Sequence, residues 1–410
     1  NKRMMIKNTK KKFEILSLFS GGGFLDIGFI NQGFEVSEAV EVEQSFIDAY
    51  NYAIDGYVDY LNNTNSNKWK IKHHEISEPI DASNPKQQKR LANEHKGITG
   101  IIGGPPCQDF SNAGKNAGVK GERGKLINSY YKIVKKIEPE FLFFENVDGL
   151  ITNKKHSKAF LSLVRRISAL GYRVYYDVLN SMEYGIPQDR DRLTLVAFKR
   201  EIIDTLKKDG FKDIRNKKKL KYSGNEDFIF KWPEIVCESP KDQNWPGEWS
   251  FGKKASKDPL QNIPKEYHRL CVINAWNGIT KNSPNQKAQF RPYSNKFQTV
   301  NEGFVKNKSF KRLHRYRYSP AVAYGNNEVH LHPTEPRRIS VREALRLQSV
   351  PDAYVFPESA TLTDMFKIIS NGVPVAKAEL IAKEIRRTLE NFHNSRIKEA
   401  RTSAIEMVRL

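Results

Sequence analysis

A thiol and a carboxylate stand where two apolar segments of the chain end. Cys107 follows two prolines, which fix the backbone, directly after the apolar run Ile98–Gly103. Glu145 ends the apolar run that starts at Phe141. A thiolate can attack an electrophilic carbon, and a carboxyl group can donate or hold a proton, so both could serve one reaction. A buried structural cysteine and an exposed glutamate at a strand end are the simpler alternatives.

Two further groups could bind a ligand. The glycines at 21–23 separate an apolar segment from a helical pattern, and Glu41 and Glu43 end the next apolar segment. Such a turn suits a nucleotide-like cofactor, although its spacing is not G-x-G-x-x-G and a tight connection would also need glycine. In the run at 188–192, Arg190 and Arg192 alternate, so they would point the same way and could hold an anion or a carbonyl. A solvated charge run is the alternative.

Alternating apolar segments and helical patterns indicate an α/β protein. The expected strands are Phe13–Phe19, Phe34–Val42, Ile98–Gly103, Glu138–Val147, Arg173–Asn180 and Leu193–Phe198. The expected helices are Phe24–Gln32, Ser157–Leu170, Val341–Gln348 and Val375–Phe392. This order predicts a mostly parallel sheet with helices on both faces, whose ligands bind at the carboxyl ends of the strands.

The composition narrows the class of protein. Lys and Arg number 68 against 47 Asp and Glu, so the formal charge of +21 predicts an anionic partner, most simply nucleic acid, with a merely soluble basic protein as the alternative. Three cysteines without paired spacing exclude a disulfide framework or a thiolate zinc site, and we expect no metal. No apolar run reaches the roughly 18 residues of a membrane span, so we expect no membrane association.

The composition changes after Phe198, and the stretch to about Asn327 is rich in Lys, Asn, Pro and Trp with little periodicity. We expect an inserted, irregular domain. Its segment 306–317 mixes six Lys and Arg residues with aromatic residues, which predicts contacts to phosphates and bases, whereas we expect the run 217–221 to be solvated. The residues expected in the core of the insert are Trp232, Trp245, Trp249, Trp276, Cys237 and Cys271.

The order of the motifs is more specific than any one of them. FSGGG, GGPPCQ, ENV, QDRDR, RRISVREALRLQ and SNGVPVAKA follow one another along the chain. Over about 12–200 and 317–390, the sequence resembles the DNA cytosine-5 methyltransferases of bacterial restriction–modification systems. The segment between carries no motif that we can match, as that family's target-recognition region would lead one to expect.

The resemblance implies a Rossmann-like methyltransferase fold, S-adenosylmethionine as the cofactor and double-stranded DNA as the partner. A methyl group would pass to carbon 5 of a flipped-out cytosine in a specific sequence, through a covalent Cys107–cytosine adduct. The implied parts of the chain are a catalytic domain at 12–200, a target-recognition region at 201–336, a scaffold helix of the small domain at 337–364 and a C-terminal segment at 365–410 that returns to the catalytic domain.

By position, the resemblance implies that Cys107 is the nucleophile, that Glu145 holds the nitrogen 3 edge of the ring, and that Arg190 and Arg192 are the site arginines. The implied cofactor site consists of Phe19, Gly21, Gly23, Glu41, Glu75, Ile76, Pro106, Leu126, Asn371 and Val373.

Two positions depart from the family pattern, and we expect them to affect cofactor geometry rather than the reaction. Phe24 stands where the first motif usually has glycine, and Ser370 replaces the usual glycine before the last motif. Gly372 stands where small residues are normal.

Other classes of function are open. They are an RNA methyltransferase of the same chemistry, an enzyme that acts on a free pyrimidine nucleotide, and a catalytically inactive DNA-binding protein. The long insert and the charge favour duplex DNA, and the intact Cys107, Glu145 and Arg192 argue against an inactive protein. We further expect a monomer in the cytoplasm, associated with the nucleoid through its DNA, and a cognate restriction endonuclease that acts on the same site.

Overall fold

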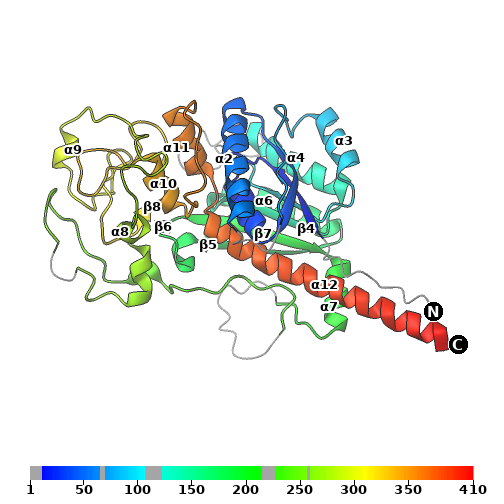
Figure 1. Ribbon diagram of the computed structural model, residues 1–410. Coiled ribbons are helices and arrows are strands. Elements are labelled where there is room, and N and C mark those ends of the chain that lie inside the picture. Colours follow the sequence, from blue (N-terminus) through cyan, green and yellow to red (C-terminus); the bar gives the residue numbers. More distant parts are fainter. Residues whose placement is uncertain (1–11, 65–69, 107–121, 215–226, 256–258, 410) are drawn as a thin grey trace.

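The chain forms a large domain built on one sheet and a smaller, irregular domain beside it (Figure 1). The computed structural model describes residues 12–64, 70–106, 122–214, 227–255 and 259–409. The long helix α12 (Val375–Arg409) runs toward the side of the large domain that faces away from the small domain (Figure 1).

The large domain contains a six-stranded sheet in the order β2-β1-β3-β4-β7-β5. Neighbouring strands are parallel except for β7, which runs antiparallel to both of its neighbours. This confirms the predicted mostly parallel α/β fold. The strands are β1 (Phe13–Leu18), β2 (Phe34–Val40), β3 (Gly100–Gly103), β4 (Phe141–Val147), β5 (Tyr172–Asn180) and β7 (Asp191–Lys199).

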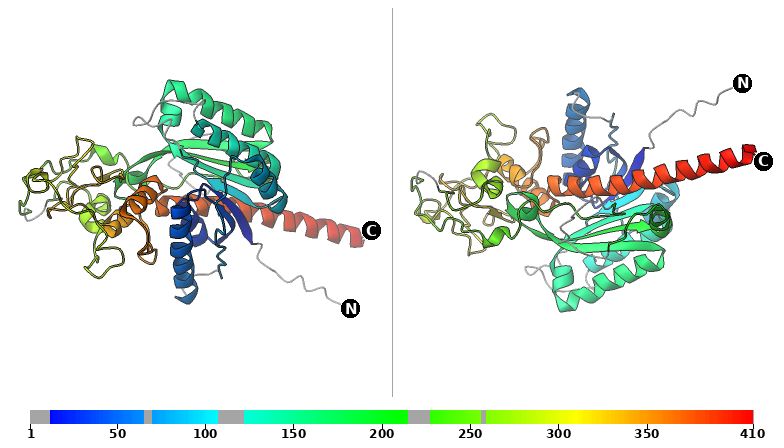
Figure 2. Two further views of the ribbon diagram at one scale, coloured as in Figure 1. Left: turned by 90° about the horizontal axis from the view of Figure 1, so that it is seen from above. Right: turned by 90° about the horizontal axis from the view of Figure 1, so that it is seen from below.

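Helices cover both faces of the sheet (Figure 2). One face is covered by α1 (Phe24–Asn31), α2 (Gln44–Asn63) and α12 (Val375–Arg409). The other is covered by α3 (Pro85–Glu94), α4 (Glu122–Ile137) and α6 (Lys154–Ala169), with the short α5 (Gly149–Thr152) before α6. Fully buried strands such as β4 are apolar almost throughout because both of their faces pack against helices.

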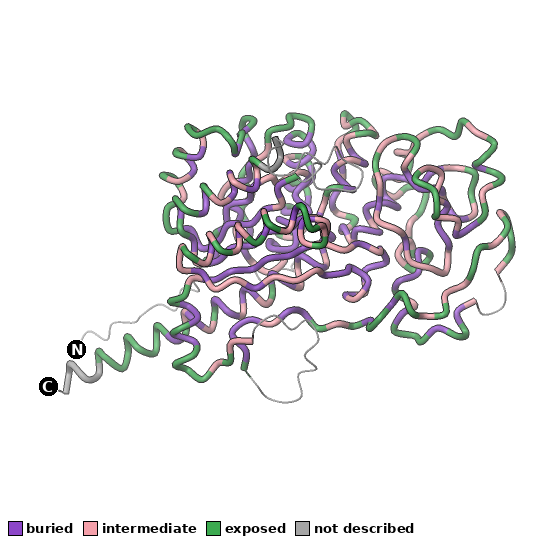
Figure 3. Tube along the Cα trace, turned by 180° about the vertical axis from the view of Figure 1, so that it is seen from behind, coloured by how far each residue is buried: buried purple, intermediate pink, exposed green. Residues whose placement is uncertain are grey.

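Helix α12 is longer than predicted, because the apolar helix and the charged tail form one continuous element. Its first part is buried in the domain, whereas residues 396–404 extend beyond the domain and are exposed (Figure 3). Helix α7 (Arg200–Lys208) packs against α12. Within the described residues, no helix combines the length and the apolar character that a membrane crossing requires.

The segment after α7 packs on the large domain before the chain enters the small domain. The ring of Phe230 lies 5.1 Å from Tyr175 and 5.7 Å from Phe198 on the sheet, and Trp232 packs edge-on against Phe230 at 5.1 Å. Trp232 is therefore buried, as expected, but against the large domain rather than in the core of the insert. The predicted boundary at residue 201 stays a prediction.

The small domain has little regular structure, in keeping with its weak periodicity. Its short strand β8 (Ser319–Pro320) pairs with β6 (Gln188–Asp189) of the large domain. Its helices are α8 (Val272–Ala275), α9 (Lys296–Thr299), α10 (Val341–Leu347) and α11 (Leu362–Asn371). Among the described residues, short 3-10 helices span Pro240–Asp242 and Lys265–Leu270, and another spans Ser181–Tyr184 directly after β5.

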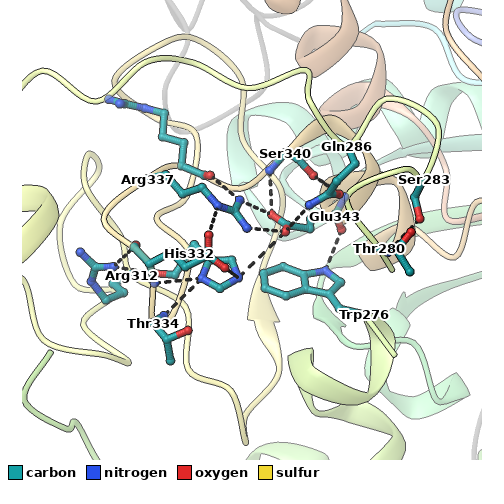
Figure 4. A network of polar contacts seen from close by, with 12 residues as sticks. Trp276, Thr280, Ser283, Gln286, Arg312, His332, Thr334, Arg337, Ser340 and Glu343 are labelled. Carbon is teal, nitrogen blue, oxygen red and sulfur yellow. Dashed lines mark hydrogen bonds and ion pairs between the residues drawn. The ribbon is translucent and has the colours of Figure 1, made fainter. Parts of the chain in front are cut away.

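A polar network takes the place of regular structure at the start of α10 (Figure 4). Arg337 forms two parallel hydrogen bonds to Glu343, of 2.7 and 2.8 Å, and Ser340 and Glu343 cap the helix reciprocally. Trp276 donates to the carbonyl of Glu343 and stacks on His332. Burial lowers the pKa of His332 to about 4, so its ring is neutral at pH 7.

The interpretation of 306–317 as a segment that grips DNA is wrong for its central residues. Arg312 is fully buried and donates to the backbone carbonyls of Phe297, Val300, His332 and Glu335. Its charge stabilises loops that have no sheet or helix to satisfy their carbonyls. Lys306 and Lys308 are exposed, so contact with DNA phosphates stays a prediction for these two residues. The run 217–221 lies outside the described residues.

Close packing of α1 on α12 requires a glycine. A Cβ atom added to Gly28 would lie 2.5 Å from the Cβ of Ala378 and 2.7 Å from the backbone nitrogen of Glu379. Since backbone atoms cannot move aside independently, a side chain at Gly28 must push the two helices apart.

We predict that Gly28→Ala lowers the free energy of unfolding by about 1–3 kcal/mol, measured by urea denaturation. Gly56→Ala is the matched control, because Gly56 lies inside α2 with open space at its Cβ position, and alanine there should stabilise by up to about 1 kcal/mol. A Gly28→Ala variant as stable as the natural protein would contradict the packing described above.

Candidate active site

The parallel strands bring the predicted site residues to one edge of the sheet. Leu18 at the end of β1 is aligned with Val40 at the end of β2 and with Gly103 at the end of β3, and Gly103 is aligned with Phe144 in β4. The glycine turn, Glu41, the proline loop and Glu145 therefore follow one another along the carboxyl edge, where α/β sheets bind ligands.

Glu145 and Arg192 form an ion pair at this edge. In the antiparallel register, Arg192 lies opposite Val147, two residues along β4 from Glu145, so both side chains emerge on the same face. Arg192 Nε lies 3.3 Å from Glu145 Oε1, and the side chains are only 17% and 8% exposed. Little water screens the pair, so the two opposite charges attract each other strongly.

Arg190 has a different set of partners. It is 2% exposed, and its Nη2 donates to the backbone carbonyls of Ser370 (2.7 Å) and Gly372 (2.9 Å). Burial and the nearby Arg192 hold the pKa of Arg190 well below its ordinary value. The two arginines were predicted to act together, but Arg192 contacts Glu145 whereas Arg190 fixes the C-terminal motif against the sheet edge.

The glycine turn is organised by Glu41. The backbone N–H of Gly21 donates to Glu41 Oε2 at 2.9 Å, while Glu41 Oε1 accepts from the N–H groups of Val42 and Glu43. A Cβ at Gly21 would meet no atom within 4 Å, so the turn leaves open space beside this carboxylate. Phe19 has a left-handed φ of 58°, a strained conformation for a residue with a side chain.

The remaining predicted positions lie around the same edge. Ile76 is buried, and its backbone exchanges two hydrogen bonds with the side chain of Asn51, whereas Glu75 is exposed. Leu126 is half-buried on α4. Pro106 is exposed at the end of a loop that Asn146 holds by donating to the carbonyl of the preceding proline, at 3.0 Å.

Cys107, the predicted nucleophile, directly follows Pro106 in sequence but lies outside the described residues. The same loop passes next to Glu145, because a Cβ added at Gly104 would lie 3.4 Å from Glu145 Oε2. Asn371 is exposed at the end of α11, and Val373 is buried.

The departure from the family pattern at Phe24 is accommodated by Gly372. The ring of Phe24 occupies the space beside Gly372, where a Cβ would lie 2.3 Å from Phe24 Cδ2. Tyr354 packs edge-on against Phe24 and donates a 2.9 Å hydrogen bond to the carbonyl of Gly22. The bulky residue at 24 thus requires the smallest residue at 372, and together they hold the glycine turn to the C-terminal motif.

Sequence reasoning missed two residues that join the domains at this edge. Gln188 and Gln348 are fully buried, and Gln188 Nε2 donates to Gln348 Oε1 at 3.1 Å and to the carbonyl of Leu347. Gln188 Oε1 in turn accepts from the backbone N–H of Val322 in the small domain. The sequence did offer a signal for them, because each is a glutamine within a motif that is otherwise helical or extended.

Sequence reasoning also missed Lys377, which is 1% exposed in the first turn of α12. The sequence offered a signal for its burial, because Lys377 lies on the same stripe of the helix as the buried Ile381 and Ile385.

One group of carboxylates and a histidine gathers elsewhere in the described part of the chain. Ligand atoms of Glu38, Glu94 and His95 lie within 4.8 Å of one another. Arg90 forms ion pairs with both glutamates, so part of the negative charge that a cation would need is already neutralised. The expectation that the protein needs no metal stays a prediction.

Solved structures with this fold include other methyltransferases. A prophage-encoded E. coli protein matches with a TM-score of 0.55 and 24% identity, covering 92% of this chain and 100% of that one. The S. pombe Dnmt2 methyltransferase matches with a TM-score of 0.51 and 14% identity over 93% of this chain and 99% of that one. The class is therefore an α/β protein of the methyltransferase fold.

The sequence comparisons define the family. The model of the C-5 cytosine-specific DNA methylases matches residues 13–387. The Type II methyltransferase M.NmeDI of Neisseria meningitidis serogroup C is 39% identical over 402 residues, 96% of this chain and 88% of that protein. M.FnuDI of Fusobacterium nucleatum is 28% identical over 92% of this chain and 95% of that protein.

The chain belongs to the C-5 cytosine-specific DNA methylase family, and it is a DNA cytosine-5 methyltransferase of the bacterial restriction–modification type. The predicted family and enzyme class are confirmed. The RNA and free-nucleotide alternatives, and the inactive binding protein, receive no support from these relatives. Use of S-adenosylmethionine is general in methyltransferase families, and the family name implies a DNA substrate.

We predict that Gly372→Ala destabilises the protein by about 1–3 kcal/mol in the natural background, because its methyl group meets the Phe24 ring. In a Phe24→Ala background, the same substitution should cost almost nothing, since the obstructing ring is gone. Thermal or urea unfolding of the four proteins of this cycle measures the coupling. Equal costs of Gly372→Ala in both backgrounds would show that the two positions are independent.

Proposed function

We propose that this methyltransferase acts on a cytosine flipped out of a specific double-stranded DNA sequence, through a transient covalent bond between Cys107 and carbon 6 of the ring. The observation that carries the proposal is the buried Glu145–Arg192 pair beside the proline loop that leads to Cys107. A target base inside the duplex cannot reach such a site, so it must leave the stack at a cost of a few kcal/mol.

The residues at the glycine turn suit S-adenosylmethionine. The carboxylate of Glu41 is oriented by three backbone N–H groups and can accept hydrogen bonds from ribose hydroxyls, while the open space at Gly21 allows close approach of a ligand. We propose that Phe19, Gly23, Ile76 and the other cofactor positions inferred from the family complete this site. When bound, the cofactor supplies an electrophilic methyl group on a sulfonium.

The proposed reaction requires a thiolate because carbon 5 of cytosine is a poor nucleophile. The Cys107 sulfur would bond to carbon 6, and the ring electrons displaced toward nitrogen 3 would be neutralised there by a proton from the Glu145 carboxyl group. Carbon 5 then bonds the methyl group. Loss of the carbon 5 proton to a base, whose identity is open, restores the double bond and releases the thiolate.

Arg192 would contribute in two ways. Its contact with Glu145 fixes that carboxyl group at the sheet edge, and its positive charge can stabilise negative charge that develops on the ring carbonyl. Arg190 would act as a positioning residue, since its guanidinium is occupied by the carbonyls of Ser370 and Gly372.

The DNA would lie between this edge and the small domain. The net charge of +21 favours a polyanion, and the Gln188–Gln348 contact brings the small domain next to the edge. We propose that small-domain loops read the sequence, and that the enzyme works as a monomer on chromosomal DNA in the cytoplasm. A cognate endonuclease acting on the same site is part of this proposal.

The covalent step can be tested with duplex DNA of random sequence in which 5-fluorocytosine replaces cytosine. Fluorine cannot leave as a cation, so the enzyme should stay bonded to the ring after methyl transfer. With S-adenosylmethionine present, we predict a denaturant-resistant protein–DNA band that Cys107→Ala abolishes.

Cys271→Ala is the matched control, because Cys271 is fully buried and burial raises the pKa of its thiol to about 12. This variant should form the adduct. An adduct that persists in Cys107→Ala would rule out Cys107 as the nucleophile. A natural enzyme that methylates DNA without trapping would contradict the covalent mechanism.

A further inference from the structure

Two buried glutamines connect the loop after β8 to the last turn of α11. Gln188 on β6 and Gln348 at the end of α10 are both fully buried. The backbone N–H of Val322, which lies just after β8, donates to Gln188 Oε1 at 3.0 Å. Gln188 Nε2 donates to Gln348 Oε1 at 3.1 Å, and Gln348 Nε2 donates to the carbonyl of Ile369. These groups form one continuous chain of hydrogen bonds.

The direction of this chain is fixed at both ends. A backbone N–H can only donate and a backbone carbonyl can only accept. Val322 therefore requires the oxygen of Gln188, and Ile369 requires the nitrogen of Gln348. Gln188 Nε2 also donates to the carbonyl of Leu347 at 3.1 Å. Among side chains of this length, only glutamine offers both a donor and an acceptor at neutral pH.

The chain of hydrogen bonds ends beside the proposed cofactor site. A helix leaves its last carbonyls without partners inside the helix, so the carbonyl of Ile369 in α11 needs a donor from outside, and Gln348 supplies it. The same turn packs on the glycine turn, because a Cβ added at Gly22 would lie 2.3 Å from Ile368 Cγ2. A displacement of the end of α11 would therefore move a wall of the proposed cofactor site.

The other end of the chain of hydrogen bonds is tied to the segment that carries the site arginines. Gln188 pairs with Ser319 of β8, and the N–H of Ser319 donates to the carbonyl of Pro187 at 2.9 Å. Arg192 follows on the same extended segment and lies 3.3 Å from Glu145. The small domain is thus attached to the polypeptide segment that places Arg192 at the sheet edge.

A buried polar pair defines a geometry more narrowly than apolar contact does. Hydrogen bonds weaken steeply when donor and acceptor move out of line, so a fully bonded buried network favours one arrangement of the parts that it joins. The β6–β8 pairing is only two residues long and offers few hydrogen bonds of its own. The glutamine pair adds the contacts that hold the small domain in one position against the edge.

We propose that Gln188 and Gln348 are positioning residues, which set the small domain relative to the cofactor edge so that a cytosine in bound DNA meets the methyl donor. This inference rests on the proposed function, in which small-domain loops hold the DNA. The cofactor binds at the edge itself, so its affinity does not depend on where the small domain lies. Methyl transfer does depend on it, because a displacement of about 1 Å between reacting groups can cost 10²-fold in rate.

The test compares Gln188→Glu and Gln188→Met with the natural enzyme. Glutamate keeps the shape and the oxygen that accepts from Val322, but at neutral pH it has no donor for Gln348 or Leu347. Methionine removes donor and acceptor without adding a charge. Transfer of a tritiated methyl group from S-adenosylmethionine to unmethylated plasmid DNA is measured in single turnovers, over a range of cofactor concentrations and below the melting temperature of each variant.

At pH 8 and saturating cofactor, we expect both variants to be at least about 10-fold slower than the natural enzyme. The cofactor concentration that gives half the maximal rate should stay within about 2-fold of the natural value, because the cofactor contacts are kept. Burial beside two oxygens raises the pKa of the introduced carboxyl group, so a falling pH restores a donor. The rate of Gln188→Glu relative to the natural enzyme should therefore rise from pH 8 to pH 6, whereas that of Gln188→Met should stay low.

Gln88→Glu is the matched control. Gln88 is 3% exposed and its Nε2 donates to the carbonyl of Ala82, but it lies on α3, away from the small domain (Figure 1). This variant should lose stability and keep the natural saturating rate. Gln188→Met alone decides the comparison of rates if Gln188→Glu does not fold.

Three results would overturn the inference. They are a natural saturating rate in the Gln188 variants, an equal loss of rate in Gln88→Glu, and a change confined to the cofactor concentration at half-maximal rate. Failure of the natural enzyme to trap fluorocytosine would instead count against the proposed covalent step, because the comparison of variants needs only methyl transfer to DNA.

Discussion

The reversal of a single strand determines the chemistry of this edge. If β7 ran parallel to β4, its first residues would lie at the opposite end of the sheet, away from every loop that binds ligands. Running antiparallel, it starts at the carboxyl edge and places Arg192 beside Glu145. Removal of one member of such a desolvated pair would leave the other charge uncompensated, so the two positions depend on each other.

Around this pair, contacts between distant parts of the sequence hold the edge together. Arg190 binds the carbonyls of Ser370 and Gly372, and Gly372 in turn accommodates the ring of Phe24. The glycine turn, the arginine run and the C-terminal motif thus form one unit although hundreds of residues separate them. The methyl donor and the target cytosine would then meet at the carboxyl edge of the sheet, whose geometry is set by this packing rather than by any single loop.

Much of this was predictable from the sequence, for physical reasons. Apolar runs such as Phe141–Phe144 must be buried, so the strands of the sheet could be predicted. Parallel strands bring their carboxyl ends together, so the position of Glu145 at that edge could be predicted as well. Helix α2 was missed because tyrosines, asparagines and aspartates obscure its buried stripe, although Phe46, Tyr50 and Tyr57 do follow a helical period.

Side-chain partners could not be predicted in the same way. Arg190 and Arg192 are both arginines and stand two positions apart, yet their partners differ. Arg190 donates to carbonyls of the C-terminal motif, whereas Arg192 pairs with a carboxylate. Arg312 lies in a basic run that resembles a DNA-binding surface, but irregular loops needed an interior donor. Burial of Lys377 depends on how α12 meets the sheet, which no local pattern encodes.

The central claim is that Glu145 and Arg192 act on the base as one unit. It is tested most directly by single-turnover methylation rates of Glu145→Gln, Arg192→Met and the double variant. We predict that Glu145→Gln alone is slower by about 10²–10⁴-fold and that adding Arg192→Met slows it little further, because residues that act together are not additive. A double variant whose loss equals the product of the two single losses would contradict the account.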